Sequence, residues 1–249
     1  MTILLSVQGV SKSFDNSQAL SQITFDLPEG QILGLVGPKR SGKAVLYSII
    51  HGAHAPDEGR IIFRDKDVTH LKSYQHAKLG LARTHEIPKL YNLLSIKGYL
   101  SVCALFGREY LQRRKIGQLS EDITEVVNLL GLPDIMVSSL KVLELRRLLL
   151  ARALISRPLL LLLDNVFAGL DSTESIALIE SIQQIRKRGV TILMVDHDMQ
   201  AIMKAADRII VLDYGRKIAD GEPKEISKNE EVIQAYLGDP KFAKKHQPA

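Results

Sequence analysis

The chain has 249 residues, of which 45% are apolar and 24% are charged, and it contains 17 glycines and 9 prolines. This composition is typical of globular proteins and excludes collagen-like, disordered and disulfide-stapled classes. Cys103 is the only cysteine, so an internal disulfide and a multi-cysteine metal site are excluded, and a reducing compartment is expected. The 33 Lys and Arg residues exceed the 28 Asp and Glu residues, which gives a formal net charge of +5. Because this charge is dispersed and only 5% of the residues are aromatic, we do not expect nucleic-acid binding.

The apolar runs in the sequence are much shorter than the roughly 18 residues that a membrane-spanning helix requires. The first residues, MTILLSVQGVSKSF, lack the basic start and the apolar core of a secretory signal peptide. These two observations predict a cytoplasmic protein that reaches a membrane only through partners.

The first part of the chain is predicted to form strands around one glycine-rich loop. Residues 4–10 and 19–27 alternate between apolar and polar side chains, which indicates two strands joined by a polar turn. Residues 31–37, QILGLVG, form a short apolar strand that ends in glycine. The segment GPKRSGKAVLYSII, residues 37–50, then predicts a loop followed by a helix. Residues 60–68, RIIFRDKDV, are expected to form one further strand.

The second part predicts helices first and then strands that alternate with helices. From about residue 96 to residue 153, apolar side chains recur at spacings of three and four, which indicates helices. Residues 159–164, LLLLLD, are too apolar for a surface helix and predict a parallel strand that is buried on both faces. We then expect a helix over 172–188, a buried strand over 190–196, a helix through residue 203 and a strand–turn–strand over 208–223. The fold class is therefore α/β with a largely parallel sheet.

The glycine-rich loop, residues 37–44, nearly fits the phosphate-loop pattern G-x-x-x-x-G-K-[ST]. In such loops the backbone N–H groups surround phosphates, and the lysine, here Lys43, neutralises their charge. The last position departs from the pattern, because Ala44 replaces the hydroxyl residue. Taken by itself, the loop leaves nucleotide binding and an ordinary glycine turn as equal alternatives.

Several further motifs follow the glycine-rich loop in the sequence. Asp164 ends the apolar run and is followed by FAGLD, which ends at Asp171. His197 lies in ILMVDHDM, AADRIIVLDYGRKIADGEP follows, and the motif EEVIQAYLG ends at Gly238. In this order and spacing, the chain resembles the ATP-binding subunit of an ABC transporter. The resemblance covers residues 3–238 and is greatest to the branched-chain amino-acid importer type.

This resemblance implies a P-loop NTPase core with a small antiparallel β subdomain and a helical subdomain at about 87–153. The cassette would span residues 1–240, and residues 241–249 would form a basic C-terminal tail. The family pairs two ATPase subunits, as a homodimer or a heterodimer, on transmembrane permease subunits. The implied location is peripheral, on the inner face of the cell membrane, and the implied cofactors are ATP and Mg²⁺.

The resemblance also assigns roles to individual residues. Phe14 would stack on adenine, although a plain core-facing strand residue is the alternative. Asp164 would hold Mg²⁺ through water, and Asp171 would belong to the loop that crosses the dimer interface. His197 would contact the γ phosphate, although a hydrogen-bonded histidine at a strand end is the alternative. The nucleotide-binding loop would consist of Gly37, Pro38, Lys39, Arg40, Ser41, Gly42, Lys43, Ala44 and Val45.

Three positions near the nucleotide depart from the family. Ala44 stands where a Ser or Thr hydroxyl binds Mg²⁺, and a methyl group cannot replace an oxygen ligand. Arg40 replaces a loop glycine, at a cost on the order of 1 kcal/mol if the position requires a positive φ. Glu86 replaces the glutamine that senses Mg²⁺ and the attacking water, and a carboxylate only accepts hydrogen bonds.

The catalytic base and the signature segment are also changed. Asn165 replaces the glutamate that polarises water, and loss of a general base costs roughly 10²–10⁴ in rate, or about 3–5 kcal/mol of barrier. The family's Leu-Ser-Gly-Gly-Gln segment lacks its serine hydroxyl and its glycines here, and Leu143 puts bulk where a partner's γ phosphate would lie. The substituted segment reads Leu140, Lys141, Val142, Leu143 and Glu144.

These changes leave three hypotheses. The chain could be a working ATPase subunit, a structural or regulatory subunit that does not hydrolyse ATP, or an altered inactive cassette. Because the family's subunits pair head to tail, a homodimer would contain two defective sites, and an intact partner would rescue neither. Lys39, Arg40 and Lys43 could replace part of the metal's charge, which predicts weak nucleotide binding that depends little on Mg²⁺. The alternative is that Lys39 and Arg40 point into solvent.

Overall fold

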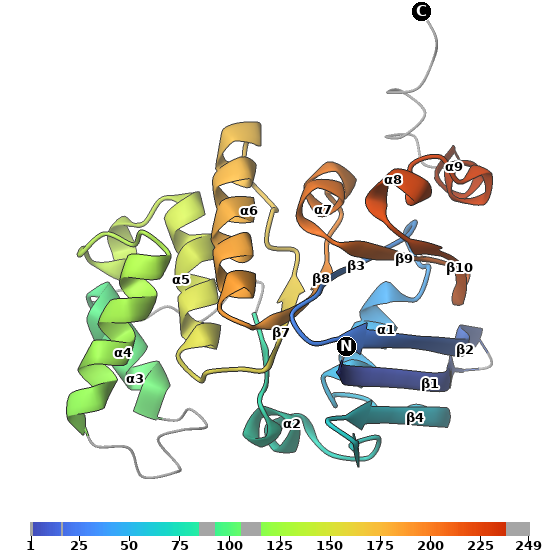
Figure 1. The fold of residues 1–249 in the computed structure, drawn as a ribbon, viewed down its shortest axis with the longest axis horizontal. Helices are drawn as coiled ribbons and strands as arrows, with labels where there is room; N and C mark the ends of the chain where they lie inside the picture. The colour runs from blue at the N-terminus through green and yellow to red at the C-terminus, as the bar shows by residue number, and fades with distance from the viewer. Residues whose placement is uncertain (1, 16, 85–92, 106–115, 238–249) are drawn as a thin grey trace, which may run out of the picture.

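The computed structural model describes residues 2–15, 17–84, 93–105 and 116–237. The described chain contains a four-stranded sheet, with the order β2-β1-β4-β5, and a six-stranded sheet, with the order β10-β9-β3-β8-β7-β6. Helices α3, α4 and α5 form a group at one end of the molecule, at the left of Figure 1. The four-stranded sheet lies near the opposite end of the same view.

The four-stranded sheet is antiparallel, and its β1–β2 pair confirms the two strands expected near the start of the chain. Residues 60–68, however, were expected to form one strand, and that prediction was wrong. The chain reverses between β4 and β5 at Arg64 (φ 49°) and Asp65 (φ 59°). Two consecutive positive φ values are those of a tight hairpin turn, which the apolar-to-polar change in RIIFRDKDV did not reveal. The strand bounds are β1 Ile3–Phe14, β2 Ser17–Pro28, β4 Glu58–Phe63 and β5 Lys66–Asp67.

The six-stranded sheet has parallel pairing between β9, β3, β8, β7 and β6, and β10 is antiparallel to β9. The fold class expected from the sequence is therefore confirmed. Strand β6 was not anticipated, because a three-residue strand is too short to show alternation. The bounds are β3 Ile32–Val36, β6 Leu81–Arg83, β7 Leu160–Asp164, β8 Thr191–Val195, β9 Arg208–Asp213 and β10 Arg216–Gly221.

The part of the chain described between β6 and β7 is helical, as the three-and-four spacing predicted. The boundaries at 1–240, 87–153 and 241–249 remain predictions, because residues 85–92, 106–115 and 238–249 lie outside the described residues. The helix bounds are α1 Lys43–Ile50, α2 Ser73–Leu79, α3 Ile96–Leu105, α4 Ile116–Leu129, η2 Val137–Ser139, α5 Val142–Leu154, α6 Ser172–Lys187, α7 Met199–Ala205, α8 Pro223–Ile226 and α9 Glu230–Leu237.

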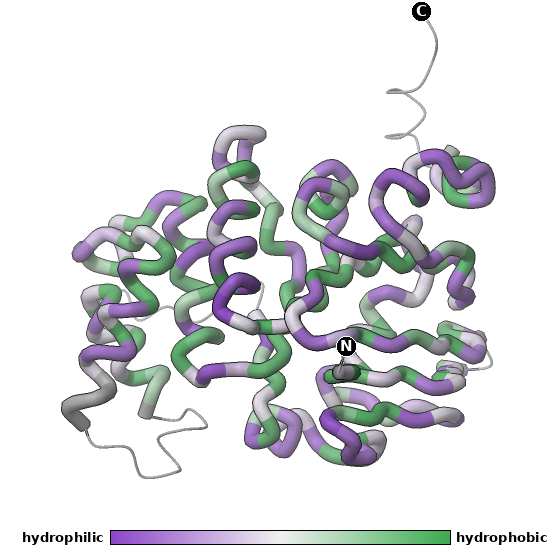
Figure 2. The backbone as a smooth tube through the Cα atoms, in the orientation of Figure 1, coloured by the Kyte–Doolittle hydropathy of each residue, from purple (hydrophilic) through white to green (hydrophobic). Residues whose placement is uncertain are grey.

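Strand β7 is buried on both faces, as its composition predicted. Leu160 and Leu162 belong to the cluster that includes α1 and the four-stranded sheet. Leu161 and Leu163 belong to the cluster that includes α5, α6 and α7. The tube in Figure 2 is correspondingly hydrophobic along the central strands and mixed along the outer helices. The parallel sheet is thus a central layer that packs against a hydrophobic cluster on each face. This packing fixes the positions of the carboxyl ends of its strands.

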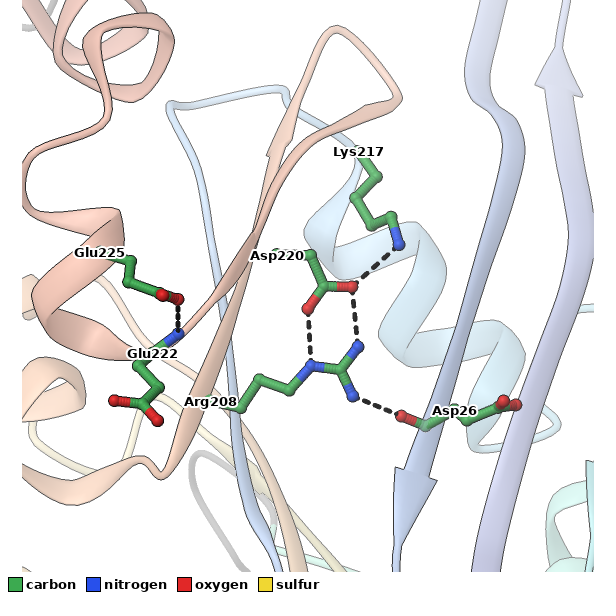
Figure 3. A network of polar contacts seen from close by, with 6 residues as sticks. All are labelled: Asp26, Arg208, Lys217, Asp220, Glu222 and Glu225. Carbon is green, nitrogen blue, oxygen red and sulfur yellow. Dashed lines mark hydrogen bonds and ion pairs between the residues drawn. The ribbon is translucent and has the colours of Figure 1, made fainter.

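A polar network joins the edge of the six-stranded sheet to β2 (Figure 3). Arg208 donates two hydrogen bonds to the Asp220 carboxylate, at 2.6 and 2.8 Å, and one to the Asp26 carbonyl oxygen at 2.9 Å. Lys217 also donates to Asp220, at 2.9 Å. Although burial opposes the effect, hydrogen bonds from Arg208 and Lys217 hold the pKa of Asp220 below its ordinary value. The two sheets therefore have a fixed relation, which matters because both contact the glycine-rich loop.

Candidate functional site

The glycine-rich loop between β3 and α1 packs against both sheets. Gly37 has φ 153°, and a Cβ there would lie 2.1 Å from the Leu212 carbonyl oxygen. Gly42 has φ 100°, and a Cβ there would lie 2.7 Å from the Ala19 carbonyl oxygen. Both positions therefore require glycine for conformation and for space. The loop has little freedom to adopt another shape.

Lys43 begins α1, and its side chain folds back over this loop. Its Nζ donates to the Gly37 carbonyl oxygen at 2.6 Å, to the Pro38 carbonyl oxygen at 2.7 Å and to Ser41 Oγ at 3.2 Å. Burial lowers the pKa of Lys43 to about 8. An ammonium group held inside a loop at a helix N-terminus is suited to an anionic ligand such as a phosphate chain.

The outer part of the loop carries the changed positions. Lys39 and Arg40 are exposed to solvent, which agrees with the alternative considered for them. Arg40 has φ 65°, so position 40 does have the left-handed conformation at which a non-glycine residue is strained. Ala44 is exposed and offers no oxygen, and Val45 is partly buried. Within the described part of the chain, no three His, Cys, Asp or Glu side chains group as a metal site. The described residues of the loop fit a phosphate group, and Ala44 among them offers no oxygen to Mg²⁺.

The carboxyl ends of β7 and β8 bring three predicted residues to one edge of the sheet. Asp164 ends β7 and pairs in register with Val195 of β8. Asn165 follows with φ 48°, and its N–H donates to the Val195 carbonyl oxygen at 2.9 Å. His197 follows β8 and is exposed, so its ring is not enclosed in the core. Tyr47 on α1, the helix that carries Lys43, donates its hydroxyl to the Leu162 carbonyl oxygen of β7 at 3.3 Å. Burial, and after it the charge of Asp164, raises the pKa of Tyr47.

Asp196 is a residue at this edge that the sequence reasoning missed. Its carboxylate is buried and accepts backbone N–H groups from Phe167 at 3.0 Å, His197 at 2.7 Å and Asp198 at 3.0 Å. Burial raises the pKa of Asp196, while the three N–H donors oppose that shift. A carboxyl side chain between a buried strand and a candidate histidine was the signal in the sequence.

Phe14 ends β1 and is 41% exposed, so the alternative of a core-facing strand residue does not describe it. Its ring meets the His54 ring edge-on, with 5.9 Å between the centroids. Lys12 Nζ lies 5.5 Å from the centroid of the same ring. An exposed aromatic ring that is braced in this way can stack on a planar ligand.

The segment predicted to correspond to the signature begins helix α5. Lys141 precedes the helix and cannot accept a hydrogen bond from it, whereas Glu144 accepts the Lys141 N–H at 2.8 Å. Val142 is 44% exposed, and Leu143 is partly buried against the core. Of the two apolar side chains, Val142 is therefore the more accessible. The Glu144 carboxylate adds negative charge where a helix N-terminus would otherwise attract an anion.

The β7–α6 loop, residues 165–171, connects this segment to the edge of the sheet. Arg146 Nη2 donates to the Ala168 carbonyl oxygen at 2.5 Å. A Cβ on Gly169 would lie 3.7 Å from Val142 Cγ1, so the loop passes close to the start of α5. Asp171 caps α6 and accepts the Glu174 N–H at 2.8 Å. Glu86, the remaining candidate residue, lies outside the described residues.

Comparison with known families matches residues 20–168 to "ABC transporter". The chain belongs to the ABC transporter family. Residues 216–241 of the cassette also match "branched-chain amino acid ATP-binding cassette transporter". The resemblance recognised from the sequence motifs is therefore confirmed. None of the cassette's described helices combines the length and apolar character that crossing a bilayer requires.

Curated relatives cover nearly the whole cassette. The high-affinity branched-chain amino acid transport ATP-binding protein LivG of Escherichia coli K12 is 31% identical over 95% of this chain and 98% of its own length. A probable branched-chain amino acid transport ATP-binding protein of Archaeoglobus fulgidus is 29% identical over 94% and 95%. The lipopolysaccharide export system ATP-binding protein LptB of Acidithiobacillus ferridurans is 29% identical over 96% and 98%.

Solved structures agree on the fold of the cassette. An ATP-binding cassette of an ABC transporter in its ADP conformation superposes with a TM-score of 0.85, at 21% identity, over 96% of this chain and 100% of that one. A cassette from the complex cbiONQ of Clostridium perfringens has a TM-score of 0.83 at 22% identity over 98% of each chain. At these identities the comparison supports the fold alone.

Proposed function

We propose that this cassette is the ATP-binding subunit of an importer of the branched-chain amino-acid type, and that it binds nucleotide but hydrolyses it very slowly. The observation that carries the proposal is the contrast at the edge of the sheet. The phosphate loop keeps Gly37, Gly42 and the buried Lys43, whereas Asn165, at the carboxyl end of β7, cannot act as a base.

The importer type rests mainly on the C-terminal part of the chain. Relatives from branched-chain amino-acid transport and from lipopolysaccharide export have nearly equal identities, 31% and 29%, so overall identity does not separate import from export. The match at residues 216–241 favours the branched-chain amino-acid type. The proposed partners are transmembrane permease subunits and a second ATPase subunit. They would hold the cassette on the inner face of the membrane, and the permease would select the substrate.

Slow hydrolysis follows from the chemistry of the substituted positions. An amide at position 165 cannot take a proton from water, and Ala44 supplies no oxygen to Mg²⁺. At the start of α5, the exposed Val142 and the Glu144 carboxylate are poorly suited to a phosphate. ATP is the proposed ligand, with Mg²⁺ contributing less than is usual in the family.

The test compares binding with turnover on the same preparation. We expect calorimetry to detect ATP binding by the purified chain, with and without EDTA, and phosphate release to stay at background, alone and with the permease. Lys43→Ala is the variant that should lose binding, and Lys66→Ala, at an exposed lysine of β5, is its matched control. Vanadate-sensitive turnover at about 1 s⁻¹ or faster would show a working ATPase. Absence of ATP binding would instead support a structural or regulatory subunit.

A further inference from the structure

Two consecutive residues of the β7–α6 loop, Phe167 and Ala168, are hydrogen-bonded to two different elements. From the β8–α7 turn, residues 196–198, the Asp196 carboxylate accepts the Phe167 N–H at 3.0 Å. From helix α5, Arg146 donates to the carbonyl oxygen of the next residue, Ala168, at 2.5 Å. The loop therefore joins the turn that carries His197 to the helix that carries the altered signature segment.

Asp196 makes the contacts within the turn and the contact to the loop with a single side chain. Its Oδ1 accepts the N–H groups of His197 at 2.7 Å and Asp198 at 3.0 Å, and its Oδ2 accepts the Phe167 N–H. The side chain is only 5% exposed, so water contributes little to its solvation. Hydrogen bonds to a charged acceptor are strong, and a buried acceptor that loses its donors is costly. The loop and the turn are thus expected to move as one body.

We propose that Asp196 is a positioning residue that makes the β8–α7 turn and the β7–α6 loop a single rigid unit. A displacement of His197 is then passed through this loop to Arg146 and so to the start of α5, within one chain. This inference rests on the proposed nucleotide site only for its consequence, which is that a ligand at His197 alters the signature segment. The mechanical connection itself is independent of nucleotide.

A neighbouring carboxylate provides the matched control. Asp198 lies two residues away and caps α7 by accepting the Ala201 N–H at 3.1 Å. Among the residues that the structure describes, its side chain hydrogen-bonds to α7 and not to the β7–α6 loop. Asp198→Asn therefore changes the same functional group close by without touching the proposed connection.

The first experiment measures amide hydrogen exchange in the full chain without ligand. Asp196→Asn replaces one acceptor oxygen by an NH₂ group that faces N–H donors. We expect exchange at Phe167 and His197 to become about tenfold faster or more, because a charge-assisted hydrogen bond is lost. Asp198→Asn should accelerate exchange at Ala201 only. Unchanged exchange at Phe167 in Asp196→Asn would overturn the proposal.

The second measurement asks whether the effect reaches α5, which Asp196 does not itself contact. Amide chemical shifts in the first turn of α5, residues 142–145, should move in Asp196→Asn and stay in place in Asp198→Asn. They should also move in Arg146→Gln, and the double variant should add little to the larger single effect. Shifts confined to residues 165–167 and 196–198 would show a local structural role and contradict the coupling. If Asp196→Asn does not fold, Asp196→Glu is used instead, because it keeps the negative charge but moves the carboxylate away from its N–H donors. The amide shifts of residues 142–145 in that variant then decide whether the coupling exists.

The consequence for ligand binding is tested last and separately. Where ATP binds, its addition should shift the residue 142–145 amides in the wild-type chain and not in Asp196→Asn. Equal shifts in both chains would overturn this step. If ATP fails to bind the wild-type chain, the proposed function fails, while the two ligand-free measurements still decide whether the loop and the turn are coupled.

Discussion

The phosphate loop and the proposed signature segment depart from the family's pattern in different ways in this cassette. In the phosphate loop the backbone is retained, since Gly37 and Gly42 fit against carbonyl oxygens of two sheets. Its changes, Arg40 and Ala44, are on side chains exposed to solvent. In the signature segment the glycines themselves are gone, and Val142 and Leu143 lie at the start of an ordinary helix.

This difference shows which constraint each region is under. The phosphate loop is part of the packing between the sheets, so its glycines are required for folding whether or not a ligand binds. The start of α5 is at the surface, where Lys141 and Val142 are exposed, so the packing of the core does not require glycines there. The proposed loss of chemistry is therefore greatest where the fold does not depend on the residues.

Repair of catalysis should give the largest effect. Asn165→Glu alone should leave turnover at background, because the metal position and the signature segment remain altered and such groups act as one assembly. Restoring two loop positions, the Glu86 and Asn165 positions and two positions of the signature segment together should recover measurable phosphate release. A single Asn165→Glu variant that turns over ATP at about 1 s⁻¹ or faster would contradict this. The combined variant carries Arg40→Gly, Ala44→Thr, Glu86→Gln, Asn165→Glu, Lys141→Ser and Leu143→Gly.

Substitutions in the phosphate loop and in the signature segment should differ in their effect on the Mg²⁺ dependence of ATP binding. In the wild-type chain, we expect ATP to bind with similar affinity in Mg²⁺ and in EDTA. Ala44→Thr should make the magnesium complex bind about tenfold tighter than free ATP, since a ligating oxygen is restored. Lys141→Ser, in the signature segment, should leave the metal preference unchanged in the isolated subunit. A strong metal requirement in the wild-type chain, measured by calorimetry, would show that other groups replace the missing ligand.

Proton uptake should report the environment of Lys43. Its pKa is lowered to about 8 from an ordinary value of 10.5, so above pH 8 the folded chain binds fewer protons than the unfolded chain. Stability without ligand should therefore rise with pH through this window. Phosphate groups beside Lys43 would raise its pKa again, so ATP binding near pH 9 should take up most of one proton. Calorimetry in two buffers of different ionisation enthalpy measures this, and equal enthalpies near pH 9 would contradict it.

Glycine substitutions should have opposite, smaller effects in the two regions. Arg40→Gly relieves a left-handed residue and should stabilise the chain by about 0.5–1 kcal/mol. Leu143→Gly removes a partly buried side chain from a helix and should destabilise by about 1–2 kcal/mol. Urea unfolding of both variants measures the changes. A destabilised Arg40→Gly variant would mean that the arginine makes a compensating interaction.

Much of the central fold could be predicted because burial leaves a strong pattern. Residues 159–164 show an apolar run that is typical of a strand covered on both faces, and β7 is observed there. The helix expected over 172–188 is observed as α6 Ser172–Lys187. The hairpin at Arg64 and Asp65 was missed because neither residue is a glycine or an asparagine. Strand β6 was missed because it owes its conformation to its neighbour β7 rather than to its own three residues.

The sequence named candidate site residues but could not give their contacts. Lys43, Asp164 and His197 were named from motif and spacing, and their roles toward a ligand stay predictions. Asp196 and Arg146 were not named, because their roles depend on backbone groups from segments that are distant in the sequence. The exposure of Phe14 also could not be read from strand alternation, since the residue lies at the end of β1 where the core stops.

The packing of the phosphate loop between the two sheets has a consequence for the thermal unfolding of the cassette. Gly215 in the β9–β10 turn donates to the Ser41 carbonyl oxygen at 3.1 Å. The Ala19 carbonyl oxygen of β2 lies so close to Gly42 that a Cβ there would be only 2.7 Å from it. A ligand bound in the loop would stabilise the contact between the two sheets. Separating the antiparallel sheet from the parallel one would remove residues that hold the loop in its binding conformation. Ligand binding should therefore merge the two sheets into one cooperative thermal transition and protect β2 from proteolysis.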